Sequence, residues 1–232
     1  MQRNAGTLQA GIDLGTEHVL SLSDGTQEVN PRFLKSAAKR IATLNRELAR
    51  RKRFGENWKR TKIRLAKKYA KVANQRADFQ HKLTANLVAT YGILATEELS
   101  IKNMTAHGGA YKNGLNRSIL DVGMATILQK LRYKAEETGT GRLWFVPTRT
   151  VKPSQTCPLC GHQEKKLLSQ RVHHCKNCGY TENRDVAAAQ VMLGWAIEHY
   201  GKELACGDGS GVPANPCEPR NPDQSAAALG RG

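Results

Sequence analysis

The chain has 232 residues and 39% apolar content, which is typical of a globular protein with one sizeable core and a small satellite unit. No apolar run approaches the roughly 18 residues of a membrane span, and no apolar secretory segment opens the chain, so we expect a cytoplasmic protein without a membrane partner. The formal net charge of +16 favours a polyanionic partner, with nucleic acid as the leading candidate because neutralising phosphates releases counterions.

Strand patterns fill the first 30 residues. Residues 8–14 are apolar and bounded by glycines, and two further short runs, 19–23 and 26–30, flank the turn Asp24-Gly25. This order predicts a meander of strands joined by tight turns.

Residues 31–92 change to a helical pattern. Apolar residues recur at three- and four-residue spacing from Leu34 to Leu48 and, after a break at residues 54–57, from Trp58 to Leu83. This spacing predicts two long helices packed as a hairpin.

The predicted hairpin is strongly basic. Between Arg32 and Arg76 there are 17 Lys or Arg but only two acidic residues. Salt bridges along the helices therefore cannot account for most of these cations. A solvated face is the simple explanation of a charge run, but this imbalance favours a face that binds nucleic acid. The residues expected to contact nucleic acid are Arg50, Arg51, Lys52, Arg53, Lys59, Arg60, Lys62 and Arg64.

The rest of the chain alternates between strand and helix patterns. We expect strands at residues 93–99 and 143–146, a glycine- and asparagine-rich loop at 103–117, and helices at 117–137 and 185–200. Beyond residue 202 the composition loses all periodicity, which predicts a disordered tail.

Four of the six cysteines form two C-x-x-C pairs, Cys157 with Cys160 and Cys175 with Cys178, separated by 14 residues. In a basic cytoplasmic protein this spacing indicates a metal site rather than disulfides. A glycine follows each pair, as a metal-binding knuckle requires where φ becomes positive. Four thiolates complete a tetrahedral Zn²⁺ site without an open position, so the predicted zinc is structural.

Three histidines lie near the cysteines: His162, His173 and His174. We expect all three to be surface residues, because four better zinc ligands already exist.

Three acidic residues lie where they could form a second metal site. Asp13 is in the middle of an apolar strand, on the face opposite Ile12 and Leu14, and such an acid is unfavourable unless it meets a cation. Glu97 ends a strand and Asp185 begins the final helix, so the three carboxylates could converge at one end of a sheet and bind Mg²⁺ or Mn²⁺. Taken singly, Asp13 could be a turn residue and Asp185 a helix N-cap, and spacing alone leaves both interpretations open.

Several motifs occur together and in a fixed order: Gly11-Ile-Asp-Leu-Gly15, Thr96-Glu-Glu-Leu-Ser100, the two C-x-x-C pairs, and Thr181-Glu-Asn-Arg-Asp-Val-Ala-Ala-Ala189. With shorter matches at residues 78–83, 132–134 and 153–157, this combination resembles the TnpB proteins of insertion sequences, relatives of the type V CRISPR effector nucleases. The resemblance covers about residues 8–200.

The resemblance implies an α/β fold: an RNase H-like (RuvC) mixed sheet with flanking helices, a basic helical hairpin insertion and a small four-cysteine zinc ribbon. Asp13, Glu97 and Asp185 match the three metal-binding carboxylates of the family, with Glu98 as the rival of Glu97. The implied activity is guide-RNA-directed hydrolysis of DNA by a two-metal mechanism. The implied partners are a guide RNA and a DNA target, and the implied location is the bacterial cytoplasm, at the nucleoid when bound to DNA.

The implied division of the chain is: first RuvC strands, 1–30; basic helical hairpin, 31–92; RuvC continued, 93–150; zinc ribbon, 151–182; final RuvC helix, 183–202; disordered tail, 203–232.

One departure from the family pattern concerns the N-terminus. Family members usually carry an N-terminal half that binds guide RNA, whereas only about seven residues precede the first strand here. The resemblance therefore implies a truncated form or an isolated catalytic part with its carboxylates intact.

A non-cleaving protein that binds guide RNA or DNA is the alternative function. A strand-joining transposase is less favoured, because no tyrosine or serine recombinase motif is evident, and the oligomeric state stays open.

Overall fold

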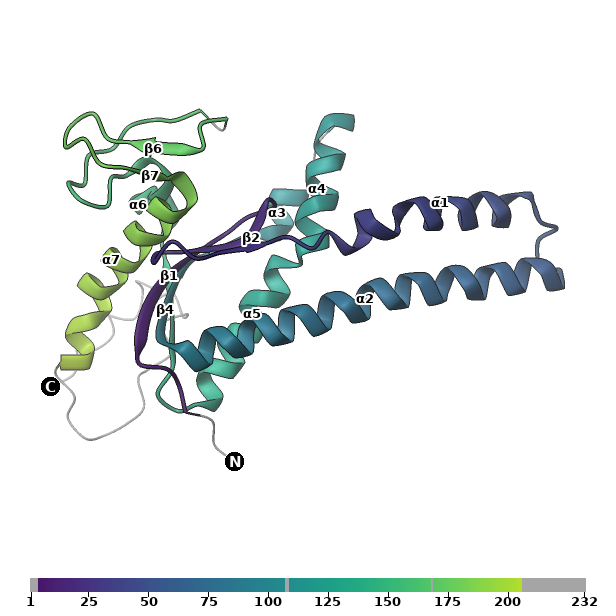
Figure 1. Cartoon of the computed structure of the whole chain (residues 1–232), viewed down its shortest axis with the longest axis horizontal. Helices are drawn as coiled ribbons and strands as arrows, with labels where there is room; N and C mark the ends of the chain where they lie inside the picture. The colour runs from purple at the N-terminus through teal and green to yellow at the C-terminus, as the bar shows by residue number, and fades with distance from the viewer. Residues whose placement is uncertain (1–3, 107–108, 168, 206–232) are drawn as a thin grey trace, which may run out of the picture.

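Five short strands form one mixed sheet with helices on both faces in this computed structural model, which describes residues 4–106, 109–167 and 169–205 (Figure 1). The strand order is β3-β2-β1-β4-β5, with β1 to β3 antiparallel and β4 and β5 parallel to β1. Parallel pairing of β1 with β4 requires a long crossover, which two helices supply. The strands are β1 (Leu8–Leu14), β2 (His18–Leu22), β3 (Gln27–Val29), β4 (Tyr91–Glu97) and β5 (Arg142–Val146).

Alternation along the strands divides the core into two apolar clusters. Ile12 on β1 and Leu94 on β4 face one side, where they pack with helices α2 (Glu56–Thr90) and α5 (Met124–Glu137). Ala95, the next residue of β4, faces the other side and packs with α7 (Arg184–Ala205). Each sheet face therefore has its own helical cover.

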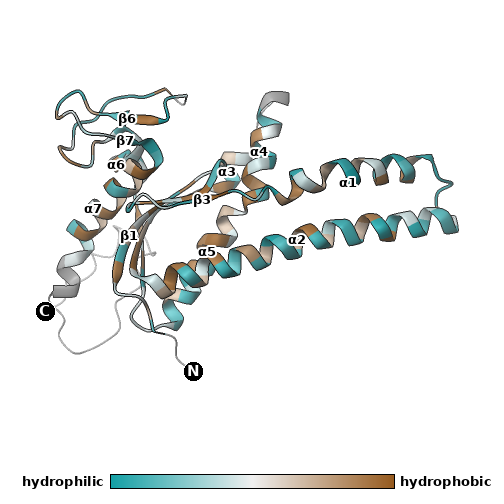
Figure 2. Ribbon diagram, viewed as in Figure 1, coloured by the Kyte–Doolittle hydropathy of each residue, from teal (hydrophilic) through white to brown (hydrophobic). Residues whose placement is uncertain are grey.

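The helices α1 (Phe33–Arg50) and α2 lie side by side and project from the sheet as a hairpin (Figure 1). Ile41 and Leu44 of α1 and Thr61 and Val72 of α2 are buried along this hairpin, whereas its outer surface is hydrophilic (Figure 2). The apolar spacing of the sequence correctly predicts both helices. With 35 residues, α2 extends about 50 Å, so the far end of the hairpin lies well away from the sheet.

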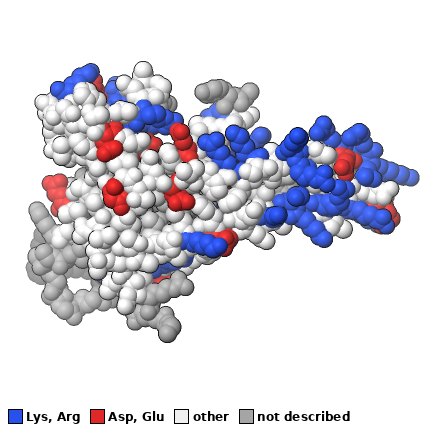
Figure 3. Space-filling model, in the orientation of Figure 1, with Lys and Arg blue, Asp and Glu red and all other residues white. Residues whose placement is uncertain are grey.

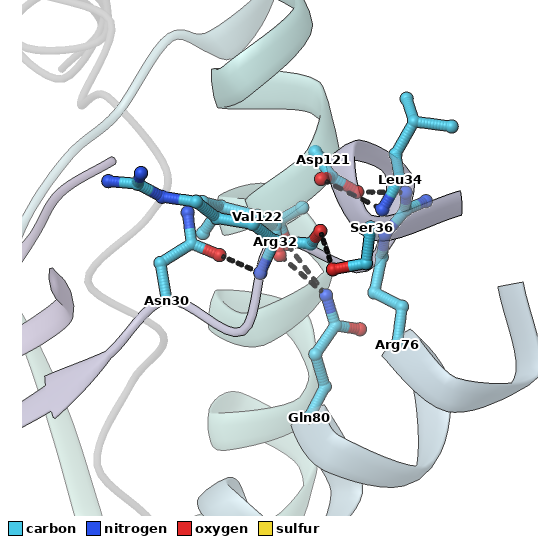
Figure 4. Close-up of polar contacts among 9 residues, drawn as sticks. Asn30, Arg32, Leu34, Ser36, Arg76, Gln80, Asp121 and Val122 are labelled. Atoms are coloured by element: carbon cyan, nitrogen blue, oxygen red, sulfur yellow. Dashed lines mark hydrogen bonds and ion pairs between the residues drawn. The ribbon is translucent and has the colours of Figure 1, made fainter. Parts of the chain in front are cut away.

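The root of the hairpin is held by Asp121, which lies on helix α4 (Ala110–Val122) and has a side chain that is only 9% exposed (Figure 4). One carboxylate oxygen of Asp121 accepts a hydrogen bond from Arg76 of α2 at 2.6 Å, and the other accepts from the backbone N–H of Leu34 at 3.2 Å. Asn30 accepts a hydrogen bond from the backbone N–H of Arg32, just before α1. One acidic side chain therefore ties both helices of the hairpin to the body.

Two expectations for residues 103–137 are wrong. The predicted loop is largely helical, because it contains the end of α3 (Ile101–Thr105) and the first part of α4, whose Ile119 and Val122 pack in the core. The predicted helix at 117–137 is two helices, α4 and α5, separated by Gly123 with φ +68°. Glycine adopts this left-handed conformation without strain, so the chain changes direction there.

The cysteine region forms a small ribbon next to the N-terminal end of α7 (Figure 1). Helix α6 (Thr148–Val151) and a short 3-10 helix (Pro153–Gln155) lead into it, and β6 (Val172–His174) pairs antiparallel with β7 (Thr181–Asn183). Strand β7 runs directly into α7, so the ribbon and this helix are continuous. Residues 203–205 belong to α7 and not to the predicted tail, whose remainder from residue 206 lies outside the described residues.

Within the described part of the chain, every helix is too short or too polar to span a lipid bilayer.

Candidate active site, zinc site and nucleic-acid interface

Helix α7 crosses β1 at Gly11, where the two backbones approach closely. A Cβ atom on Gly11 would lie 1.8 Å from the carbonyl oxygen of Ala189, so only glycine fits there. Asp13 lies two residues further along β1, about 6.7 Å away, and Asp185 lies four residues back along α7, about 6 Å away. Because the strand and the helix run in opposite directions (Figure 1), these similar displacements bring the two carboxylates to the same end of the sheet.

Glu97 joins this pair through the strand register. Gly11 pairs with Ala95 and Ile12 with Thr96 in the parallel ladder, so the next position puts Glu97 beside Asp13 on the face covered by α7. Glu98 follows the end of β4 and is exposed. The geometry therefore favours Glu97 over its rival Glu98, as the resemblance also did.

The two neighbouring carboxylates perturb Asp13. Burial raises the pKa of Asp13 well above its usual range, the negative charges of Glu97 and Asp185 raise it further, and Arg184 opposes them. Burial also raises the pKa of Glu97. A cation would relieve this repulsion, and an all-carboxylate donor set suits Mg²⁺ or Mn²⁺.

The beginning of α7 is capped by a residue that the sequence analysis did not single out. Asn183 accepts hydrogen bonds through its side-chain oxygen from the backbone N–H groups of Asp185 at 2.9 Å and Val186 at 3.4 Å. The carboxylate of Asp185 is therefore not the N-cap, which was one of its two possible roles. The signal was present in the sequence, since asparagine directly before a helix is a common capping residue.

The four cysteines gather into one cluster, with all sulfur atoms within 4.8 Å of one another. Sγ of Cys157 lies 3.6 Å from Sγ of Cys178, and Sγ of Cys160 lies 3.5 Å from Sγ of Cys175. A tetrahedral zinc with Zn–S bonds of about 2.3 Å would separate its sulfurs by about 3.8 Å, whereas a disulfide requires about 2.05 Å. The cluster therefore fits Zn²⁺. Among the described residues it is the one such group gathered this closely, so the three carboxylates are spaced more widely.

The two halves of the cluster are built alike. In each, the N–H of the first cysteine donates to a carbonyl five residues later, and the N–H of the following glycine donates back to the carbonyl of that cysteine. Gly161 and Gly179 have φ of +71° and +75°, as predicted for the knuckles. A hydrogen bond with Asn177 and one with the backbone of His162 lower the pKa of Cys160 to about 6, which favours the thiolate form that a metal ligand needs.

The prediction that all three nearby histidines lie on the surface is wrong for one of them. His162 and His174 are exposed, but His173 is only 2% exposed, with its ring against Tyr180 and its Nδ1 beside Lys166. His173 is the central residue of β6, and it is buried because that strand turns one face towards the ribbon core.

A cleft of about 580 Å³ opens at the loop after β1, where Thr16 and Glu17, three and four residues after Asp13, line it. It lies between the loop after β1, the start of α1, helix α4 and the ribbon. The side chains of Arg32, Lys35 and Arg117 line it, and within the described residues none of the three has an ion-pair partner.

The acidic side chains of the cleft already form ion pairs with arginine side chains. Glu17 pairs with Arg171 at 3.4 Å, and Asp121 pairs with Arg76 at 2.6 Å. The cleft is therefore electropositive and suited to a phosphodiester backbone. Sequence reasoning missed it, because its cations come from segments far apart in the chain.

The predicted nucleic-acid contacts gather at the far end of the hairpin, where Figure 3 shows a dense group of Lys and Arg side chains. All eight occur between residues 50 and 64, at the end of α1, in the connecting loop and at the start of α2. All are exposed except Arg51, which is half-buried beside Glu47.

Two family models match the chain. The OrfB_IS605 model, described as a probable transposase, matches residues 2–107, and the model of the Cas12f1-like TNB domain matches residues 125–192.

Several curated proteins are related to the chain over most of its length. "Putative RNA-guided DNA endonuclease InsQ" of Escherichia coli (strain K12) is 34% identical over 211 residues, which cover 85% of this chain and 50% of InsQ. A "Putative RNA-guided DNA endonuclease" of Streptomyces pristinaespiralis is 31% identical over 206 residues, which cover 88% and 48% respectively. TnpB-like proteins of Acanthamoeba polyphaga mimivirus are more distant, at 24% identity. The chain spans about half the length of these first two relatives.

The fold is similar to that of Cas12f1, as seen in the cryo-EM structure of its complex with sgRNA and target DNA. The TM-score is 0.53 at 16% sequence identity, and the match covers 83% of this chain and 40% of Cas12f1. At this identity the likeness concerns the fold alone.

Proposed function

We propose, from the premise that this chain carries the OrfB_IS605 and Cas12f1-like TNB domains and is homologous to TnpB-like RNA-guided DNA endonucleases, that it is the catalytic part of such a nuclease. The observation that carries this proposal is the convergence of Asp13, Glu97 and Asp185 at one end of the sheet. The strand order β3-β2-β1-β4-β5 supports assigning the sheet to the RNase H-like RuvC type.

In the proposed reaction the protein supplies ligands, charge and position. Asp13, Glu97 and Asp185 hold divalent ions and provide no covalent nucleophile. Two bound Mg²⁺ or Mn²⁺ ions would activate a water and stabilise the leaving oxygen of the scissile phosphodiester. Arg32, Lys35 and Arg117 hold the strand beside the carboxylates through its phosphates.

The partners proposed for the chain are a guide RNA and a DNA target. Relatives named RNA-guided DNA endonucleases support this proposal, as does the basic hairpin. Base pairing with the guide reads the sequence, while the protein holds the duplex by shape and charge. The four cysteines would hold a zinc ion that keeps the ribbon folded at the start of α7, where the continuous chain from β7 positions Asp185.

The test is cleavage of labelled DNA by the chain with Mg²⁺, with and without a guide RNA complementary to that DNA. We expect Asp13→Asn to abolish cleavage and to leave DNA binding intact. Glu98→Gln is the matched control, because it changes the exposed neighbour of Glu97, and it should cleave like the parent. Cleavage by Asp13→Asn at the parent rate would overturn the assignment.

A non-cleaving protein that binds guide RNA or DNA is the alternative function. The observation that favours it is the group of exposed Lys and Arg side chains at the far end of the hairpin (Figure 3), which attracts nucleic acid whether or not the carboxylates bind metal. Salt-sensitive RNA binding without cleavage in either Mg²⁺ or Mn²⁺ supports this alternative. Metal-dependent cleavage that Asp13→Asn removes excludes it.

A further inference from the structure

The far end of the hairpin, residues 50–64 and here called the hairpin tip, carries an aromatic ring in solvent. Phe54, in the loop between α1 and α2, is 66% exposed. Its ring centroid lies 5.5 Å from that of Trp58 on the first turn of α2, with the two rings tilted by 59°. Together the two rings form a small aromatic surface at the end of the molecule that is farthest from the sheet.

Neither the backbone nor the core explains the presence of phenylalanine at this position. Phe54 has φ +68°, a conformation that is unfavourable for a bulky residue and that glycine or asparagine adopts more easily. Its ring fills no space in the hydrophobic core, because most of it is exposed. A strained, exposed aromatic residue is therefore better explained by a binding role than by folding.

Cations surround these rings. The guanidinium carbon of Arg53 lies 5.0 Å from the ring centroid of Phe54, and Nζ of Lys62 lies 5.1 Å from that of Trp58. The tip contains eight Lys or Arg and one acid, Glu56, which pairs with Lys59 at 2.8 Å. The tip thus combines ring faces for stacking with a surplus of positive charge for phosphates.

This combination suits unpaired bases better than a duplex. A duplex offers phosphates and groove edges but keeps its base faces stacked, whereas unpaired bases stack on exposed aromatic side chains. The length of α2, about 50 Å, separates the tip from the carboxylates, so the bases that meet Phe54 are not those next to the scissile phosphate. A folded RNA, which displays unpaired bases in its loops, meets both requirements.

We infer that Phe54 and Trp58, flanked by Arg53 and Lys62, form a stacking site for unpaired bases in a loop of a folded RNA. The inference rests on the proposal that the chain binds nucleic acid, but not on cleavage. In this site Phe54 supplies affinity for an unpaired base, and the surrounding cations supply attraction that does not depend on base pairing.

The experiment compares the affinity of the full chain for three labelled probes at several salt concentrations: a stem-loop RNA, the same stem as a blunt RNA duplex, and the corresponding DNA stem-loop. The variants are Phe54→Ala, Phe54→Leu and Phe54→Tyr, with Ile63→Ala as the matched control. Ile63 is 56% exposed on α2, the helix that carries Trp58, but has no ring.

We expect Phe54→Ala and Phe54→Leu to weaken binding of the RNA stem-loop roughly 5- to 150-fold, the equivalent of the ~1–3 kcal/mol that stacking one base contributes. Phe54→Tyr and Ile63→Ala should bind like the parent, and the blunt duplex should bind all variants equally. The salt dependence should not change, because no charge is removed.

Three outcomes would overturn the inference. Equal losses for the stem-loop and the duplex would remove the role of unpaired bases, and a larger loss for the DNA stem-loop would assign the site to DNA. A change in sedimentation of Phe54→Ala without a change in RNA binding would make the ring a protein contact. If the parent chain binds none of the probes, the proposed nucleic-acid function itself fails, which distinguishes the two failures.

Discussion

Asp13, one of the three proposed metal ligands, affects the stability of the fold through its pKa. Its folded-state pKa is raised by burial and by the charges of Glu97 and Asp185, so the folded protein binds a proton more tightly than the unfolded chain does. The stability from this protonation is fully present below the unfolded pKa of about 3.9 and is lost as pH rises through the higher folded pKa. At neutral pH without magnesium, Asp13 is therefore a destabilising residue.

Asp13→Asn should raise the free energy of unfolding by roughly 0.5–2 kcal/mol at neutral pH in magnesium-free buffer, because it removes a charge that the neighbouring carboxylates repel. The gain should shrink at acid pH, where Asp13 is protonated, and with Mg²⁺, which neutralises the cluster. Urea denaturation across pH measures both trends. Glu98→Gln should change stability by less than about 0.5 kcal/mol, and an equal gain in that control would contradict the explanation.

We expect the side chain of Phe54 to contribute to RNA binding without stabilising the fold. We expect Phe54→Asn to leave the free energy of unfolding unchanged or to raise it by up to about 1 kcal/mol, because asparagine tolerates a positive φ. A loss of more than about 1 kcal/mol on urea denaturation would show that the ring stabilises the fold through Trp58.

At the scale of elements, the hairpin depends on its root. Asp121→Ala removes the partner of Arg76 and the acceptor for Leu34 N–H, so it should lower the free energy of unfolding by about 2–3 kcal/mol. Asp78→Ala is the matched control, because it breaks the exposed ion pair with Lys82 on the same helix and should cost less than about 0.5 kcal/mol. Urea denaturation measures the difference, and similar losses would show that the root has no special role.

The fold of the ribbon affects the position of α7, since β7 continues directly into the helix that carries Asp185. Cys178→Ser should lose zinc and reduce cleavage by more than about tenfold, because misplacing Asp185 slightly is enough to disturb the reaction. Metal content per chain and cleavage are measured together, with His162→Ala expected to retain one zinc. Full cleavage by a zinc-free Cys178→Ser protein would refute the coupling.

For the whole molecule, we expect the binding of nucleic acid to depend more on where the positive charges lie than on the net charge of +16. Replacing Arg32, Lys35 and Arg117 together with glutamine should lower the slope of log K against log salt for single-stranded DNA, by about 0.7 for each phosphate that the variant no longer neutralises. Lys82→Gln, whose charge already pairs with Asp78, should leave the slope unchanged. Fluorescence anisotropy at several salt concentrations measures both, and an unchanged slope in the triple variant would exclude the cleft as a strand site.

The sequence by itself determined the elements whose signals are local. Apolar spacing predicted both hairpin helices, and the two C-x-x-C pairs with their glycines predicted the cysteine cluster and its positive φ angles. Such features depend on neighbours a few residues apart, so the sequence contains all that defines them.

Tertiary structure decided what depends on distant partners. Helix α4 begins at Ala110, inside the predicted glycine-rich loop, and its packing in the core through Ile119 and Val122 supports that whole helix, while the ribbon core buried His173. The register of β1 against β4 separated Glu97 from Glu98, and the approach of α7 at Gly11 brought Asp185 towards Asp13. These outcomes follow from segments far apart in the chain meeting in space, which local spacing does not encode.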